Sequence, residues 1–165
     1  MSLQQIRLNP LICCRRRPRF TMHSDYKTNS KPLSQKEFIT VLMVEDSYVD
    51  AFMLNHLLEG SSPRYDFYFT ISTTMKDAFE RLDRGNFDVA ILDLNLPDMS
   101  GLACINALKT HAPNLPVIVY SATDNTRATQ DALKCGARGY LVKGRSTSQK
   151  IQSIIESVIK STACV

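Results

Sequence analysis

The sequence predicts an α/β protein, a (βα)5 fold with a doubly wound, five-stranded parallel sheet. From residue 38 onward, short apolar runs alternate with amphipathic stretches and are separated by short polar connections. Runs such as Val117-Ile118-Val119 stay apolar without alternation, which indicates strands that are buried on both faces. Right-handed crossovers between such strands place helices on both sides of the sheet.

The alternation predicts each element in turn. Strands are expected at 39–44, 66–71, 87–92, 116–120 and 139–142. Helices are expected at about 47–59, 74–84, 100–111, 124–134 and 147–160. Glycines follow three of these helices and suit left-handed helix ends, at Gly60, Gly85 and Gly136.

Charge separates a leader from a folded body. Residues 1–38 carry eight Lys/Arg against two acids, whereas residues 39–165 carry twelve against fourteen. We therefore expect a basic, disordered N-terminal extension at 1–37, a folded domain at 38–162 and no output domain. The basic tail is the only candidate for contact with nucleic acid, which is not an expected partner.

The composition excludes several classes of protein. No apolar stretch approaches the roughly 20 residues that span a bilayer, and the apolar region of a secretory signal is missing. The five cysteines are odd in number and show no CxxC spacing, which argues against a disulfide framework and a zinc site. The expected location is the cytoplasm.

Polar side chains stand at the ends of the expected strands. Two acids, Glu45 and Asp46, end the first strand, and Asp93 ends the third. Ser121 ends the fourth strand and Lys143 the fifth. A flavodoxin-like strand order, 2-1-3-4-5, brings these ends together, because the first and third strands flank the switch point of such a sheet. Clustered carboxylates with a lysine predict a Mg²⁺-assisted phosphoryl site, although each acid alone could also cap a helix or start a turn.

Four segments of the chain carry a resemblance to a known family. They are Val-Glu-Asp (44–46), Leu-Asp-Leu-Asn-Leu-Pro-Asp-Met-Ser-Gly (92–101), Tyr-Ser-Ala-Thr (120–123) and Gly-Ala-Arg-Gly-Tyr-Leu-Val-Lys (136–143). In order and spacing they resemble the CheY-like receiver domains of two-component response regulators, over about residues 38–162.

The resemblance implies a phosphoacceptor and a magnesium site. Asp93 would accept the phosphoryl group and also bind the metal. Asp46 would bind Mg²⁺ directly, Glu45 would act mostly through water, and the backbone carbonyl of Asn95 would complete the protein ligands. Glu45 stands where the family more often has aspartate, and its extra methylene suits the water-mediated role.

The resemblance also implies how the phosphoryl group is held and read. Ser121 would hydrogen-bond the phosphoryl group and Lys143 would pair with it. Tyr140 would be the aromatic switch that turns inward when Ser121 moves, although it could also be an ordinary half-buried strand residue. The family usually has proline after the lysine, with a cis peptide. Gly144 leaves this peptide either trans or cis under strain, because a cis bond without proline costs about 2.5–4 kcal/mol.

These implications together define the expected function. The chain would be a stand-alone receiver that takes a phosphoryl group from a sensor histidine kinase or a histidine phosphotransfer protein. The donor would dock near the first helix, around Tyr48, Val49 and Phe52. A downstream protein would bind the face of the fourth helix and fifth strand. The chain would not be an enzyme beyond its own phosphorylation and dephosphorylation.

The alternative is a phosphatase of the haloacid dehalogenase type. Such enzymes also use an aspartate at a strand end, Mg²⁺ and a lysine, but they carry a second aspartate two residues after the first. Asn95 stands at that position, and the acidic pair precedes Asp93. The sequence therefore favours signalling over turnover.

Overall fold

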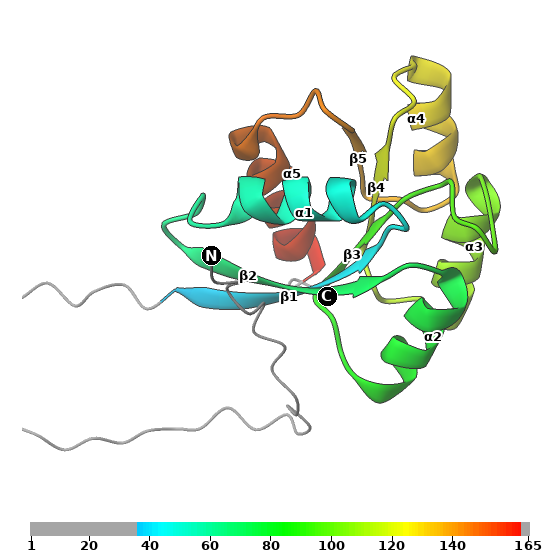
Figure 1. Cartoon of the computed structure of the whole chain (residues 1–165), viewed down its shortest axis with the longest axis horizontal. Coiled ribbons are helices and arrows are strands. Elements are labelled where there is room, and N and C mark those ends of the chain that lie inside the picture. Colours follow the sequence, from blue (N-terminus) through cyan, green and yellow to red (C-terminus); the bar gives the residue numbers. More distant parts are fainter. Residues whose placement is uncertain (1–35, 163–165) are drawn as a thin grey trace, which may run out of the picture. The chain divides into compact units, whose positions relative to one another are not determined.

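The computed structural model describes residues 36–162, in which strands and helices alternate along the chain (Figure 1). The strands are β1 (Glu37–Val44), β2 (Tyr65–Ser72), β3 (Val89–Leu92), β4 (Val117–Ser121) and β5 (Gly139–Val142). The helices are α1 (Tyr48–Leu58), α2 (Met75–Arg84), α3 (Leu102–His111), α4 (Thr126–Lys134) and α5 (Ser148–Thr162). Every predicted element is present, and its ends lie within about two residues of those expected from the sequence.

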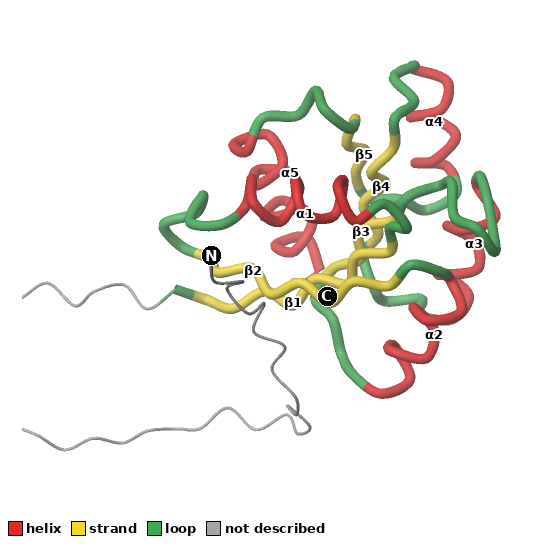
Figure 2. Tube along the Cα trace, in the orientation of Figure 1, coloured by secondary structure: helices red, strands yellow, loops and turns green. Residues whose placement is uncertain are grey.

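The sheet is parallel throughout and has the order β2-β1-β3-β4-β5, which confirms the predicted strand order (Figure 2). β1 lies inside the sheet, because it pairs with β2 over its whole length and with β3 over 41–44. The chain therefore passes from β1 to β2 on one side and then crosses back to β3 on the other side. This places a switch point, where such sheets bind ligands, at the carboxyl ends of β1 and β3.

Two apolar cores lie on the two faces of the sheet. Alternate residues of β1 divide between them: Val41 and Met43 pack with α1 and α5, whereas Leu42 and Val44 pack with α2 and α3. Figure 1 shows α1 and α5 together on one side of the sheet. All four residues of β3 are fully buried, which explains its uninterrupted apolar sequence. The strand that carries the central acid is thus held on both faces.

The helix ends agree with the sequence in two of three places. Gly60 and Gly136 follow α1 and α4 with φ values of 64° and 98°, as predicted. The prediction for Gly85 was wrong: it ends α2 at φ −153°, because the chain leaves this helix in an extended conformation. The predicted extension lies outside the described residues except for Lys36 and Glu37, and Glu37 already begins β1.

The helices of the described part are all too short or too polar to cross a membrane.

Candidate functional site

Three carboxylates converge at the carboxyl ends of β1 and β3. Asp93 follows the last residue of β3 and is 6% exposed, and Glu45 follows β1 and is 1% exposed. Asp46, the next residue, is exposed to solvent. One oxygen atom from each of the three carboxylates lies within 4.8 Å of the other two. The acidic cluster expected from the sequence is therefore present, and two of its three members are buried.

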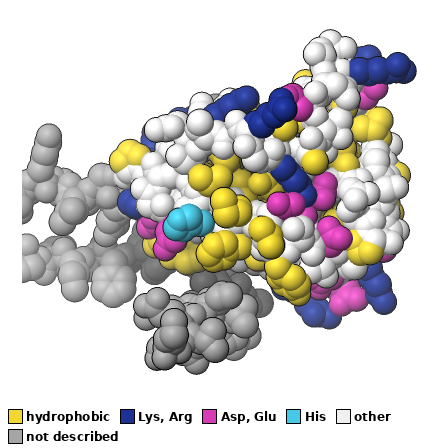
Figure 3. All heavy atoms as spheres, turned by 45° about the horizontal axis from the view of Figure 1, so that its top comes forward, with side chains coloured by type: hydrophobic (Ala, Val, Ile, Leu, Met, Phe, Trp, Pro, Cys, Tyr) yellow, Lys and Arg dark blue, Asp and Glu magenta, His cyan; other side chains and the backbone are white. Residues whose placement is uncertain are grey.

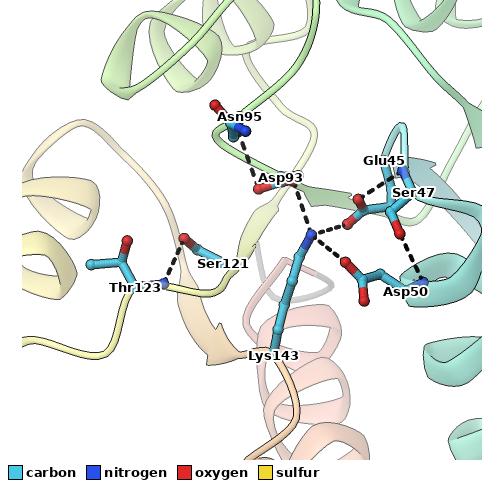
Figure 4. A network of polar contacts seen from close by, with 8 residues as sticks. All are labelled: Glu45, Ser47, Asp50, Asp93, Asn95, Ser121, Thr123 and Lys143. Atoms are coloured by element: carbon cyan, nitrogen blue, oxygen red, sulfur yellow. Dashed lines mark hydrogen bonds and ion pairs between the residues drawn. The ribbon is translucent and has the colours of Figure 1, made fainter.

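Lys143 reaches this cluster from the end of β5. Its Nζ atom lies 2.6 Å from Glu45 Oε2 and 2.9 Å from Asp93 Oδ2 (Figure 4). The ammonium also stands over the ring of Tyr120, 5.4 Å from the ring centre. The peptide between Lys143 and Gly144 is trans, and Gly144 has a positive φ of 70°. With glycine at position 144, Lys143 therefore reaches the carboxylates from a trans peptide.

Asp50 joins the site, although its place in the sequence did not indicate this. It lies in the first turn of α1, and its Oδ2 atom is 2.9 Å from Lys143 Nζ. Ser47 caps the same helix, and its Oγ accepts a hydrogen bond from the N–H of Asp50 at 3.3 Å. The Ser-x-x-Asp spacing is typical of a helix start, where an acid is favourable for local reasons. Only the packing of α1 beside α5, the helix that follows Lys143, turns the acid into a partner of the lysine.

The available oxygen atoms fit a magnesium ion. Asp46 makes no hydrogen bond or ion pair within residues 36–162, so its exposed carboxylate is available to a ligand. Glu45 has both oxygens engaged, since Oε1 accepts from Ser47 N at 3.1 Å and Oε2 faces the lysine ammonium. Among the described donors, none bonds the backbone carbonyl of Asn95. Carboxylate and carbonyl oxygens with access to water are the ligands that Mg²⁺ takes.

Ser121 and Tyr140 are connected through one residue of the loop after β4. Ser121 is buried at the end of β4, and its Oγ accepts a hydrogen bond from Thr123 N at 3.2 Å. The hydroxyl of Tyr140 donates to the carbonyl of the same Thr123 at 2.9 Å. Figure 4 shows Ser121 on the side of Asp93 away from Glu45, as the strand order requires. The two predicted switch residues are thus linked by backbone groups.

Burial and ion pairing act in opposite directions on the charges of the site. Burial raises the pKa of Glu45, and the close contact with the Lys143 ammonium only partly offsets this effect. For Lys143 itself, burial favours the neutral amine, but the contacts with three carboxylates outweigh burial and raise its pKa. Lys143 therefore stays charged at neutral pH, where it can hold an anionic group.

The chain belongs to the response regulator receiver domain family, whose sequence pattern matches residues 41–156. This range runs from β1 into α5 and includes all the site residues named above. The match confirms the resemblance that the four sequence segments carry, and it makes the chain a receiver of two-component signalling.

Two relatives with similar sequences are much longer than this chain. The transcriptional regulatory protein ZraR of Escherichia coli strain K12 is 26% identical over 124 residues, which are 75% of this chain and 27% of that protein. The protein-glutamate methylesterase/protein-glutamine glutaminase 2 of Carboxydothermus hydrogenoformans is 32% identical over 130 residues, 77% of this chain and 36% of that protein. The chain thus spans about a quarter to a third of these relatives.

Solved receiver structures share the fold over their whole length. A CheY-like receiver domain protein from Methanospirillum hungatei JF-1 has a TM-score of 0.65 at 17% identity, covering 77% of this chain and 98% of that one. The receiver domain of the sensor histidine kinase PA1611 from Pseudomonas aeruginosa PAO1 has a TM-score of 0.63 at 19% identity, covering 75% and 99%. The latter structure holds a magnesium ion in its active-site cleft. At these identities the likeness establishes the fold.

Proposed function

We propose that this chain accepts a phosphoryl group on Asp93, in a Mg²⁺-dependent reaction, from a sensor histidine kinase or a histidine phosphotransfer protein. One observation carries the proposal: a buried aspartate at the end of β3 lies against two further acids and 2.9 Å from a lysine ammonium. Carboxylates held this close repel one another unless cations neutralise them. A bound metal ion would neutralise the clustered carboxylates. The lysine would then also neutralise a phosphoryl group on Asp93.

The transfer exchanges one bond to phosphorus for another. An oxygen of Asp93 forms the new bond, the bond between phosphorus and the donor's imidazole nitrogen breaks, and that nitrogen keeps the electron pair. Lys143 neutralises charge on the phosphoryl oxygens during the transfer. A bound Mg²⁺ would supply further positive charge to the same oxygens.

We propose Asp46, Asp93 and the backbone carbonyl of Asn95 as the protein ligands of Mg²⁺, with Glu45 acting through water. The exposed and unpaired carboxylate of Asp46 supports direct binding. Glu45 supports the indirect role, because its oxygens already face a backbone N–H and the lysine ammonium.

Phosphorylation would be read through Ser121 and Tyr140. The phosphoryl group adds about −1.5 to −2 charge and strong acceptor oxygens at the end of β3. A hydroxyl such as that of Ser121 can move to donate to these oxygens, and its bond to Thr123 would carry the movement into the loop before α4. Because the same loop residue holds the hydroxyl of Tyr140, the face formed by α4 and β5 would change. This face is the proposed surface for a downstream protein.

The exposed face of α1 is the proposed docking surface for the phosphodonor. Tyr48, Val49 and Phe52 are 75%, 71% and 64% exposed, which is unusual for such large apolar side chains. Figure 3 shows hydrophobic side chains gathered beside a group of acidic side chains on this side of the molecule. Since α1 begins just after Glu45 and Asp46, a partner bound to its exposed face would lie next to the acidic cluster.

We further propose that this receiver acts in the cytoplasm and does not turn over phosphate esters. Asn95, where a haloacid dehalogenase would carry its second aspartate, supports the absence of turnover, because an amide cannot act as a general acid or base. Hydrolysis of p-nitrophenyl phosphate by the purified chain would contradict this part of the proposal.

Labelling with acetyl phosphate and Mg²⁺ tests the proposal. We expect wild-type protein to gain one phosphoryl group, detected by intact-mass spectrometry, and Asp93→Asn to gain none. Asp66→Asn is the matched control, since Asp66 is an acid on β2 that pairs with Lys36 away from the site; it should be labelled like wild type. Labelling that persists in Asp93→Asn would overturn the assignment.

A further inference from the structure

We propose that Asp50 is a positioning residue that competes with the phosphoryl group for Lys143 and so limits the stability of the phosphorylated state. The inference rests on the proposed phosphorylation of Asp93. It adds a residue on α1 that opposes this reaction, at a position that the motifs of the family did not indicate.

The ammonium of Lys143 has as many carboxylate partners as it has N–H groups. A lysine ammonium carries three donors. Its Nζ lies 2.6 Å from Glu45 Oε2, and 2.9 Å from both Asp50 Oδ2 and Asp93 Oδ2. The contacts with Asp50 and Asp93 are hydrogen bonds, whereas Glu45 Oε2 makes an ion-pair contact and accepts no hydrogen bond. A phosphoryl oxygen on Asp93 therefore competes with these partners for the charge and the N–H groups of Lys143.

Asp50 is the partner that yields at the lowest cost. Its side chain is 36% exposed, whereas those of Glu45 and Asp93 are 0% and 8% exposed. A carboxylate released from an ion pair is stable only where water can solvate it. Asp50 also lies in the first turn of α1, where the helix dipole favours its negative charge in either position.

The contact between Asp50 and Lys143 is not a by-product of helix capping. In a capping box, the acid three residues after the cap reaches back to the backbone N–H of the cap residue. Here Glu45 Oε1 accepts the N–H of Ser47 at 3.1 Å, so that donor is already satisfied. Asp50 has the capping position but directs its carboxylate to the lysine instead.

Two physical effects follow from removing the carboxylate of Asp50. One N–H of Lys143 becomes available to a phosphoryl oxygen. A negative charge that repels the incoming phosphoryl group also disappears. Both effects stabilise the phosphorylated state, so the wild-type residue acts as a brake on it.

Beryllofluoride, an analogue of the phosphoryl group, tests the inference in the full chain at saturating Mg²⁺. We expect Asp50→Asn and Asp50→Ala to bind it about two- to fivefold more tightly than wild type, the range for a partly exposed ion pair. Asp50→Glu keeps the charge and should stay close to wild type. Affinity is measured by calorimetric titration or by NMR.

Asp77→Asn is the matched control. Asp77 has the same position in α2 that Asp50 has in α1, three residues after a capping hydroxyl, that of Thr74. It pairs with Arg81 rather than with the site lysine. Its beryllofluoride affinity should equal that of wild type, so an effect of weakening a helix start is separated from an effect on Lys143.

The outcomes distinguish this inference from the function on which it rests. If wild type binds beryllofluoride and Asp93→Ala does not, unchanged or weaker binding by Asp50→Ala overturns the competition alone. Tighter binding by Asp50→Glu, equal to that of Asp50→Ala, overturns it too, because the charge would then be irrelevant. A wild-type protein that binds no beryllofluoride overturns the proposed function and this inference with it.

Discussion

The hydroxyl of Tyr140 donates a hydrogen bond to the backbone carbonyl of Thr123 over 2.9 Å. Thr123 in turn donates its N–H to Ser121 Oγ at 3.2 Å. The tyrosine ring packs against the core on the side of α2 and α3, so the hydroxyl bond ties that core to the loop between β4 and α4. A displacement of Ser121 would therefore be transmitted to Tyr140 through a single residue, Thr123.

Replacing Tyr140 with phenylalanine should weaken this transmission while leaving the site itself intact. Tyr140→Phe keeps the ring and removes the hydroxyl bond, at a cost of about 0.5 kcal/mol in stability for a bond near solvent. We expect wild-type affinity for beryllofluoride but smaller amide NMR shift changes over α4 and β5 when it binds. Tyr68→Phe, an exposed tyrosine on β2, should change neither. Undiminished shift changes in Tyr140→Phe would rule out the hydroxyl bond as the link.

Removing the charge of Lys143 should destabilise the protein, and Mg²⁺ should reverse part of the loss. Lys143→Met leaves Glu45 and Asp93 buried without their cation, and we expect a loss of about 3 kcal/mol in the free energy of unfolding. Added Mg²⁺ should stabilise the variant more than wild type, since it neutralises the same carboxylates. Urea denaturation with and without Mg²⁺ measures both effects. Lys134→Met, which loses only an exposed ion pair with Asp131, should change stability by less than about 0.5 kcal/mol.

The difference in stability between wild type and Lys143→Met has a defined pH dependence. The carboxylates raise the pKa of Lys143 above its ordinary value of 10.5, so the lysine stabilises the folded state fully below that pH. Its contribution is lost as the pH rises through the raised pKa. The stability difference between wild type and Lys143→Met should therefore persist at neutral pH and shrink in alkali. A difference that grows above pH 10.5 would contradict the raised pKa.

Asp98 should stabilise the start of α2 only while it is ionised. Its two oxygens accept hydrogen bonds from Met75 N and Lys76 N, each at 3.0 Å. Burial alone would raise the pKa of Asp98, but these backbone bonds outweigh burial and lower it. The stabilisation is therefore present above the ordinary pKa of 3.8 and is lost as the pH falls through the lowered value.

The variant Asp98→Ala tests whether ionised Asp98 stabilises the start of α2, and Thr74→Ala is its control. We expect each variant to lose about 1 kcal/mol at neutral pH, because each loses a cap of the same helix. The loss in Asp98→Ala should shrink in acid, whereas that in Thr74→Ala should not, since a hydroxyl does not titrate. Urea denaturation between about pH 2 and pH 7 measures the difference. Parallel pH profiles of the two variants would show that the charge of Asp98 is not what caps the helix.

The elements and most of the site could be predicted because they depend on local patterns. A strand buried on both faces is apolar throughout, as in β3, and its last residue is then known to within a position or two. Asp93 and Lys143 could be placed in this way, and the strand order brought them together. Asp50 could not, because an acid in a first turn has a sufficient local explanation and its contact with Lys143 depends on how α1 packs beside α5. The extended backbone of Gly85 escaped prediction for a related reason: the direction in which a chain leaves a helix is set by the next element.

The two acids after β1 should differ in their effect on Mg²⁺ affinity. Asp46→Asn removes an exposed carboxylate that is available for direct binding, and we expect its Mg²⁺ dissociation constant to rise by about tenfold or more. Glu45→Gln should have a smaller effect, because its oxygens already face Ser47 N and Lys143. Calorimetric titration with Mg²⁺ compares the variants. The reverse order of effects would make Glu45 the direct ligand.

Gly101 should be the glycine at which an added methyl group disturbs the loop after Asp93. It precedes the first residue of α3 at φ 67° and ψ −153°, a conformation open almost only to glycine. Its N–H closes the loop by donating to Leu94 O at 2.7 Å. A Cβ atom there would meet nothing within 4 Å, so the expected loss of about 1–3 kcal/mol in Gly101→Ala comes from backbone strain alone. Gly85→Ala is the control, since Gly85 is extended and its added Cβ would make an ordinary contact at 3.7 Å. Urea denaturation should show Gly85→Ala at or slightly above wild-type stability, and equal stabilities of the two variants would mean that the loop relaxes around residue 101.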